Sequence, residues 1–262
     1  MRETKTHNVP EAMRKNSERA VAGRVRAAVV APVVETSTKG ERHYRRARQD
    51  RGADTRQRLV EAALDVFGRY GFEGATTRQI AQAAKANLAA IVYHFGSKEA
   101  LHVAVAEYLA GRIAALVGPS LMAAAAPEAS ATPKAARAAL IRVLETYADV
   151  ILGEAEAERW ARFIVREQMQ PSAAFDVVYN SMGGAHGVGA RLVGVILGRS
   201  PDDEAVKLSV LTMMGQIMVF RVARELALRR MGWRTIGESE RAAIKRVVIA
   251  QVNAILDHAV LP

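Results

Sequence analysis

The chain has 262 residues, of which 50% are hydrophobic and 24% charged, with a mean hydropathy of zero. This composition is typical of a globular protein with one or two cores. The absence of cysteine excludes disulfides, thiolate nucleophiles and zinc sites that need sulfur. The longest stretch without a charged residue, Ile113–Pro127, is shorter than the roughly 20 residues that cross a bilayer. The charged N-terminus also lacks the apolar run of a signal peptide, so we expect a cytoplasmic protein with no membrane partner.

The net charge of +10 is concentrated at the N-terminus. Residues 1–52 hold 13 Lys and Arg against 6 Asp and Glu, whereas the rest of the chain holds 24 against 21. The excess includes a dense cluster with Arg45, Arg46 and Arg48. Because residues 1–50 show no sustained helical or strand periodicity, we expect 1–52 to be a flexible basic arm. Such an arm is either a solvated tail or a segment that binds a polyanion.

The first predicted helix begins near Ala53 and ends before Gly71. Aromatic residues are only 5% and the glycines follow no strand-and-turn rhythm, which favours an all-α fold for the whole chain. The apolar residues of this first helix recur on one face at helical spacing: Leu59, Ala63, Val66, Phe67 and Tyr70.

Two short helices and the start of a fourth follow. Thr76 and Gln79 have the spacing of a capping box, which predicts a second helix from about Thr77. A three-residue turn ends at Asn87, a good N-cap for a third helix of about seven residues. Two short helices joined by a tight turn form a helix-turn-helix, whose second helix enters a DNA major groove about 12 Å wide.

The starts of the second and fourth helices are suited to phosphate binding. Thr76 and Thr77 place hydroxyls and free backbone amides at one helix start, and Ser97 and Lys98 do so at the other. We therefore predict a DNA-binding helix-turn-helix domain over residues 53–101.

A second helical domain is predicted over residues 102–262. After an Ala- and Pro-rich connector, Gly118–Pro133, five helices are expected at roughly 134–152, 156–169, 172–198, 203–231 and 238–259. The fourth contains Leu208–Phe220, thirteen residues without a charge, which indicates burial in a core or against a partner subunit.

The helix-turn-helix residues carry a resemblance to a known family. The run Thr76–Ala81, followed by Ile91–Leu101, closely resembles the DNA-binding domain of TetR-family transcriptional regulators. Two later segments, Arg166–Asp176 and Gly215–Arg224, are similar to the CecR-type branch of that family. The resemblance implies a homodimer whose helical C-terminal domain dimerises and holds an effector pocket.

The resemblance also implies roles for particular residues. Thr77 and Arg78 would contact phosphates, Asn87 to Ala90 would face the groove, and Tyr93, His94 and Lys98 would complete the contacts. With the basic cluster, the predicted DNA-binding residues are Arg45, Arg46, Arg48, Thr76, Thr77, Arg78, Asn87, Leu88, Ala89, Ala90, Tyr93, His94 and Lys98.

The sequence departs from the family pattern at three places. Lys85 stands where the family usually has glycine, and Val92 replaces a tyrosine that commonly touches phosphate. The residues from Leu88 to Ala90 are all apolar, so the third helix can meet little more than thymine methyls and DNA shape. We therefore expect the basic arm to contribute by reaching an adjacent minor groove.

The effector site is less sharply defined by the sequence. Arg166 or Arg221 would face an anionic group, and the methionines on the uncharged stretch are adaptable fillers. Taken alone, each candidate residue is better explained by ordinary core or dimer packing, and we expect only that the group contains some pocket residues. The candidates are Trp160, Phe163, Arg166, Phe175, Tyr179, Met182, His186 and Gln216.

We interpret the chain as a ligand-responsive, homodimeric repressor that a small molecule releases from a palindromic double-stranded operator. One alternative is a sequence-indifferent DNA-packaging protein, and another is an enzyme with a helical cavity. The enzyme has no visible catalytic motif, because neither a Gly-x-Ser-x-Gly elbow nor a Walker loop is present. The six histidines form no close helical pairs, so no metal site and no cofactor are expected.

Overall fold

A computed structural model describes residues 39–153 and 155–257, with side chains from Arg51 onward. The chain divides into two units, Met1–Arg45 and Arg46–Pro262. The described part of the first unit is the beginning of helix α1, and every other element lies in the second. Within the described ranges every regular element is a helix, which confirms the predicted all-α fold.

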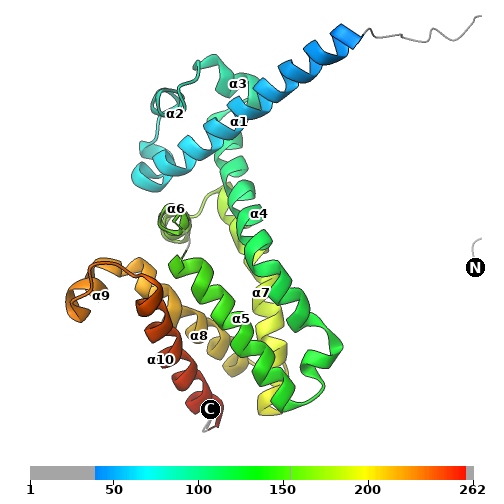
Figure 1. The fold of residues 1–262 in the computed structure, drawn as a ribbon, viewed down its shortest axis with the longest axis vertical. Coiled ribbons are helices and arrows are strands. Elements are labelled where there is room, and N and C mark those ends of the chain that lie inside the picture. Colours follow the sequence, from blue (N-terminus) through cyan, green and yellow to red (C-terminus); the bar gives the residue numbers. More distant parts are fainter. Residues whose placement is uncertain (1–38, 154, 258–262) are drawn as a thin grey trace, which may run out of the picture. The chain divides into compact units, whose positions relative to one another are not determined.

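The N-terminal helices are α1 (Lys39–Gly74), α2 (Thr77–Ala83) and α3 (Ala89–Phe95), as Figure 1 shows. The flexibility expected of the basic arm, residues 1–52, stays a prediction, but the expected helix start near Ala53 is wrong, because α1 begins at Lys39 and includes the segment 39–52. This segment contains no proline and several good helix formers, so a helix can extend through it without an apolar face. At the other end Gly71 has a φ of 73° and interrupts α1, as its position in the sequence suggested.

The predicted capping box of α2 is confirmed, whereas the N-cap of α3 is Leu88 and not the predicted Asn87. The backbone N–H of Gln79 donates to Thr76 Oγ1 at 3.2 Å, and the N–H of Thr76 donates to Gln79 Oε1 at 2.8 Å. In the following turn Lys85 has a φ of 50°, the positive φ that its glycine-preferring position suggested. Asn87 then accepts a hydrogen bond from the N–H of Ala89 at 2.9 Å. These contacts fix the angle at which α3 leaves the turn.

The remaining elements differ from prediction at two places. The expected connector from Gly118 is wrong, because α4 continues through Pro119 into a run of good helix formers. The expected helix 203–231 is two helices, because the backbone breaks at Ala223 with φ −101° and ψ 36°. The elements are α4 (Lys98–Ala125), the 3₁₀ helix η1 (Pro127–Ser130), α5 (Pro133–Gly153), α6 (Ala157–Met169), α7 (Ala173–Leu197), α8 (Glu204–Val222), α9 (Arg224–Met231) and α10 (Glu238–Asp257).

Two hydrophobic clusters hold these helices together. The first cluster joins α1–α4 to α6 and the beginning of α7, and the second joins α5 to the later part of α7, to α8 and to α10. The first contains the side chains whose sequence positions suit a small apolar core for the helix-turn-helix, with Phe72 and Phe95 only partly buried. The fully or nearly buried members of that predicted core are Leu59, Val66, Phe67, Ile80, Ala84 and Ile91.

The uncharged stretch of α8 is only half buried in the single chain. Val210, Met213 and Ile217 lie in the second cluster, whereas Leu208 and Leu211 are each 54% exposed. By length and hydropathy alone, α4 and α8 are apolar enough to cross a membrane. Both helices contribute residues to the hydrophobic clusters, as the core helices of globular domains do. The exposed face of α8 is therefore a surface that the single chain leaves uncovered.

Candidate nucleic-acid interface

Helix α3 projects from the helix-turn-helix with one anchored side and one open side. Ile91 is 1% exposed and fixes the helix to the first cluster. On the open side Tyr93 is 80% exposed, Val92 66% and Leu88 49%. Large apolar and aromatic side chains at such exposure do not stabilise the isolated chain, so they are available to contact a partner.

Two aromatic rings hold basic side chains next to α3. Lys98 Nζ lies 4.4 Å from the centroid of the Phe72 ring, and the guanidinium carbon of Arg56 lies 5.0 Å from that of Phe95. Cation–π contacts of this kind restrict a side chain without neutralising its charge. At the start of α4 the Ser97 hydroxyl accepts a hydrogen bond from the N–H of Ala100 at 3.1 Å. Ordered positive charge therefore lies beside the open face of α3, where DNA phosphates would pass.

The described residues predicted to bind DNA belong to α2, the turn, α3 and the start of α4. Thr77, Ala90, His94 and Lys98 are partly buried. The exposed ones are Thr76, Arg78, Asn87, Leu88, Ala89 and Tyr93. Arg45, Arg46 and Arg48 lie on the helical backbone of α1, but their side chains lie outside the described residues. All of these assignments as DNA contacts remain predictions.

Sequence reasoning missed Arg58, which connects α1 to the end of α2. Its Nη1 donates to the carbonyl of Ala84 at 3.4 Å, and its Nε lies 3.1 Å from Asp54. A positive charge at the C-terminal end of a helix interacts favourably with the helix dipole. This contact joins residues 26 positions apart, so no local pattern could have indicated it.

Helix α6 packs against the helix-turn-helix through Gly68 of α1. A Cβ atom at Gly68 would lie 3.4 Å from the Cβ of Arg162 and 3.5 Å from the backbone nitrogen of Phe163. Arg159 also donates to the Asp65 carboxylate at 2.9 Å and to the Glu61 carbonyl at 2.7 Å. The glycine thus permits close approach of the two helices, and Arg159 stabilises the contact.

A second arginine of α6 contacts the last turn of α1. Arg166 Nη2 donates to the carbonyl of Arg69 at 2.8 Å. The sequence placed Arg166 among the effector candidates, but it did not indicate this link to the DNA-binding helices. A displacement of α6 would therefore change this contact with the end of α1.

A buried polar network joins α4, α6 and the start of α7. His102 is 3% exposed and its Nε2 lies 3.2 Å from Glu167 Oε1, while the Ser172 hydroxyl donates to Glu167 Oε2 at 2.7 Å. Burial, with a smaller contribution from Lys98, lowers the pKa of His102 to about 4. The imidazole is therefore neutral near pH 7, and the geometry fits an Nε2–H that donates to Glu167.

The effector candidates are spread over several environments. Trp160 and Phe163 are fully buried in the first cluster, whereas Phe175 and Tyr179 stack on each other with ring centroids 6.0 Å apart. Met182, His186 and Gln216 are partly buried. Burial lowers the pKa of His186, and Gln216 Oε1 is buried without a hydrogen-bond partner. Their assignment to an effector pocket remains a prediction.

Several hollows lie between the described helices. A narrow apolar pocket of about 40 Å³ lies between α4, α5, α7 and α8, and Leu121, Tyr147 and Met213 contribute to its walls. A groove of about 830 Å³ lies between the end of α1, α6 and the junction of α8 with α9. Of the effector candidates, Arg166 lines this groove.

A helix-turn-helix with a projecting third helix, packed on further helices, is the arrangement of a DNA-binding transcriptional regulator. Residues 59–105 match the family model described as bacterial regulatory proteins, tetR family, and residues 136–258 match that of the C-terminal domain of the HTH-type transcriptional dual regulator CecR. The HTH-type transcriptional dual regulator CecR of Shigella flexneri is 34% identical over 210 residues, which are 79% of this chain and 93% of that protein. The chain belongs to the TetR family of regulators and carries a CecR-type C-terminal domain.

Solved structures share the fold at low sequence identity. A TetR-like transcriptional regulator from Rhodococcus sp. RHA1 superposes with a TM-score of 0.56 at 19% identity, covering 78% of this chain and 96% of that one. The regulator FadR from Bacillus subtilis, solved in complex with stearoyl-CoA, has a TM-score of 0.53 at 13% identity, covering 78% and 99%. At these identities the two structures show the common fold.

Proposed function

We propose that this regulator is a homodimeric repressor that binds a palindromic operator and is released from it by a small molecule. The observation that carries the proposal is the open face of α3, where Tyr93 and Val92 are more than half exposed. In a symmetric dimer two such helices would lie about 34 Å apart, in successive major grooves.

The uncovered face of α8 supports dimerisation. Leu208, Leu211, Val219 and Val222 are each more than half exposed and recur along one side of the helix. Val247 on the adjacent α10 is also more than half exposed. In a homodimer the same apolar surface of both subunits would meet, and the exposed side chains would become buried.

The contacts between α6 and α1 support release by a ligand. A small molecule that prefers a different position of α6 would shift α1, and with it the distance between the two α3 helices of the dimer. The FadR structure was solved with stearoyl-CoA, which supports a small-molecule effector for this fold. We place the repressor in the cytoplasm and assign it no catalytic step.

Selection of bound duplexes from a random pool tests the proposed function. The full chain should enrich a palindromic sequence, and Tyr93→Ala should weaken binding to that duplex by about tenfold, the loss of one well-formed base or phosphate contact. Met122→Ala is the control, because Met122 is a large side chain, 70% exposed, on α4 and outside the predicted DNA-binding and effector residues. This control variant should bind within about twofold of the native chain, since surface substitutions away from a site cost about 0.5 kcal/mol or less.

The same experiment separates the repressor from a DNA-packaging protein. A packaging protein would bind selected and scrambled duplexes equally at matched salt, because its affinity comes from phosphate contacts alone. Equal binding, with no effect of Tyr93→Ala, would contradict the proposed function.

A further inference from the structure

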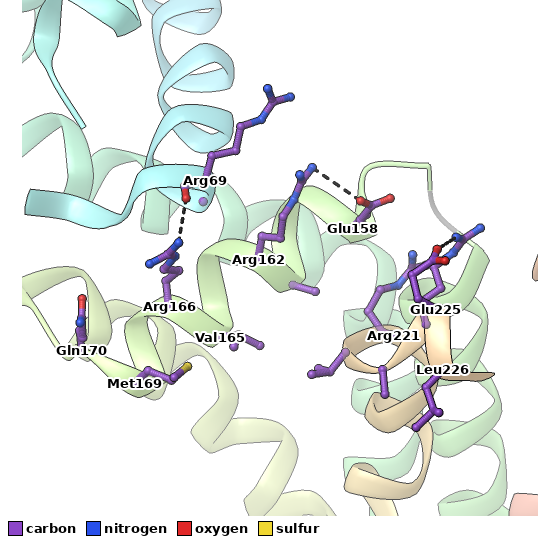
Figure 2. Close-up of a pocket in the computed structure, with 15 residues that line it drawn as sticks. Arg69, Glu158, Arg162, Val165, Arg166, Met169, Gln170, Arg221, Glu225 and Leu226 are labelled. Carbon is purple, nitrogen blue, oxygen red and sulfur yellow. Dashed lines mark hydrogen bonds and ion pairs between the residues drawn. The ribbon is translucent and has the colours of Figure 1, made fainter. Parts of the chain in front are cut away.

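The groove between α1, α6 and the α8–α9 junction is rich in arginine and is called here the arginine groove (Figure 2). Figure 2 shows Arg69, Arg162 and Arg166 on the side of α1 and α6, with Arg221, Glu225 and Leu226 opposite them. Apolar side chains of both sides complete the lining, among them Val165 and Val222. The five arginines of the groove are Arg69, Arg162, Arg166, Arg221 and Arg224.

The two acidic residues of the groove compensate only part of this charge. Glu158 lies 3.9 Å from Arg162, and Glu225 lies 3.3 Å from Arg224. Among the side chains that the structure describes, no carboxylate lies within ion-pair distance of the other three arginines of the groove. The arginine groove therefore keeps an excess of positive charge, which attracts anions.

Backbone carbonyls position two of the uncompensated guanidinium groups. Arg166 donates to the carbonyl of Arg69 at 2.8 Å, and Arg221 Nε donates to the carbonyl of Ile151 at 2.6 Å. A guanidinium group has five N–H donors, so each keeps donors for a second acceptor. Because a carbonyl carries no net charge, these hydrogen bonds orient the groups and leave the charge in place.

The surroundings of Arg221 disfavour its charged form. Partial burial and the neighbouring Arg224 both lower its pKa, and the effect of Glu158 in the opposite direction is smaller. A phosphate next to Arg221 and Arg224 would stabilise their positive charges. It would also accept paired hydrogen bonds from the guanidinium groups.

We propose that the arginine groove binds a phosphate-bearing small molecule with an apolar portion, and that this binding regulates operator affinity. The phosphate would be attracted into the groove by Arg166 on one side and Arg221 on the other, and the apolar portion would lie against Val165, Val222 and Leu226. The volume of about 830 Å³ is within the range of small-molecule sites. The regulatory half of the proposal rests on the proposed function, whereas binding to the groove does not.

The route from the groove to the DNA passes through Arg166. This side chain holds the carbonyl of Arg69 in the last turn of α1, and a phosphate in the groove would compete for it. Because α6 also contacts α1 at Gly68, movement of Arg166 toward a ligand would change the packing of α6 on the helix-turn-helix. The ligand therefore acts on the contact that sets the position of α3.

Calorimetric titration of the full chain without DNA tests the binding step. The probes are decyl phosphate below its micellar concentration and decyltrimethylammonium, which has the same alkyl chain and the opposite charge. We expect decyl phosphate to bind and the cation not to bind. Arg166→Gln and Arg221→Gln should each weaken binding by about tenfold, the loss of one charge-assisted hydrogen bond. Arg229→Gln on exposed α9 is the matched control, because Arg229 does not line the groove, and it should bind as the native chain does.

Thermal unfolding and sedimentation of each variant accompany the titration. Equal binding by the native chain and the Arg166→Gln/Arg221→Gln double variant, with both folded, would overturn the proposal. A change of oligomeric state in the double variant would also overturn it, because the groove would then belong to a subunit contact.

The regulatory step is measured with the selected operator at constant ionic strength. Decyl phosphate should change the operator dissociation constant of the native chain and of Arg229→Gln, and should leave that of the double variant unchanged. Loss of operator affinity by the double variant without any probe would show that the groove contacts DNA, which contradicts the proposal. If no duplex is selected at all, the proposed function fails, while the DNA-free titration still decides whether the groove binds phosphate.

Discussion

The two hydrophobic clusters of this regulator differ in composition and in the parts of the chain that they join. The first cluster encloses His102 and Glu167 and joins the helix-turn-helix to α6 and α7, whereas the second is apolar and joins α5, α7, α8 and α10. The DNA-binding helices therefore have no core of their own. A change in α6 or α7 reaches them through shared packing.

The polar network gives the first cluster a restricted geometry. A buried carboxylate that accepts hydrogen bonds from His102 and Ser172 is stable only where both donors are in place. An apolar cluster such as the second tolerates small shifts, because its contacts have little directional preference. A different position of α6 would therefore break directional hydrogen bonds in the first cluster, at a larger cost in free energy than a similar shift in the second.

The largest expected change in stability comes from truncating one large side chain in each hydrophobic cluster. Phe163→Ala and Met213→Ala should lower the free energy of unfolding by about 3–5 and about 2–5 kcal/mol, respectively, as measured by denaturant titration. Only Phe163→Ala should also weaken operator binding under conditions where both variants are folded, because Phe163 lies where α6 meets Gly68. Equal operator affinities would show that the clusters do not differ in this way.

Removing one polar side chain near each hydrophobic cluster should produce a smaller change in the free energy of unfolding. Glu167→Ala removes the acceptor of the buried His102 Nε2–H and leaves the Ser172 hydroxyl only His102 Nδ1, 3.4 Å away, so it should cost about 3 kcal/mol of unfolding free energy. Ser209→Ala on α8 should cost about 1 kcal/mol, because the Ser209 hydroxyl bonds only the Ala205 carbonyl of its own helix. Denaturant titration of both variants gives the two decreases in unfolding free energy, and their ratio measures how much the polar network stabilises the first cluster.

Acid should destabilise the first cluster selectively. Burial lowers the pKa of His102 to about 4 from 6.5, so the unfolded chain takes up its proton first as the pH falls. The unfolding free energy should therefore fall from pH 6.5 toward pH 4, by about 2 kcal/mol at pH 5 relative to pH 7. His102→Gln should remove the part of this dependence that comes from His102 and leave the part from His186, whose pKa burial also lowers, and denaturant titrations of both chains at the two pH values measure the difference. A native chain equally stable at pH 5 and 7 would contradict a buried, neutral His102.

The basic cluster of α1 should affect DNA binding without affecting either hydrophobic cluster. Replacing Arg45, Arg46 and Arg48 by glutamine should lower the salt slope of operator binding by about 2–3 units for each subunit, about 0.9 for each lost phosphate contact. The unfolding free energy should stay within about 0.5 kcal/mol of the native value. An unchanged salt slope would show that this part of α1 is solvated and contacts no phosphate.

Local patterns predicted the helix-turn-helix well. The capping box at Thr76 and Gln79 follows from interactions within a few residues, which a sequence displays directly, whereas the positive φ at Lys85 was suggested by the family resemblance. The early start of α1 at Lys39 escaped prediction, because a helix without an apolar face has no periodicity to detect. The break at Ala223 escaped as well, since neither glycine nor proline marks it.

The connections between regions could not be predicted from the sequence. The contacts from Arg159 to Asp65 and from Arg166 to Arg69 join residues almost a hundred positions apart. From the sequence we predicted that Arg166 or Arg221 faces an anionic group, and this assignment stays a prediction. The sequence placed them beside Trp160 and Phe163, whose rings lie inside the first cluster, because composition cannot separate a buried aromatic residue from one that lines a cavity.

The projecting α3 offers a direct means of observing the switch. The chain contains no cysteine, so Val92→Cys on the open face of α3 would provide a single thiol for each subunit. Nitroxide labels on the two thiols of the proposed dimer would report the spacing of its recognition helices by electron spin resonance. The distance between the two labels could then be compared in the presence and absence of operator.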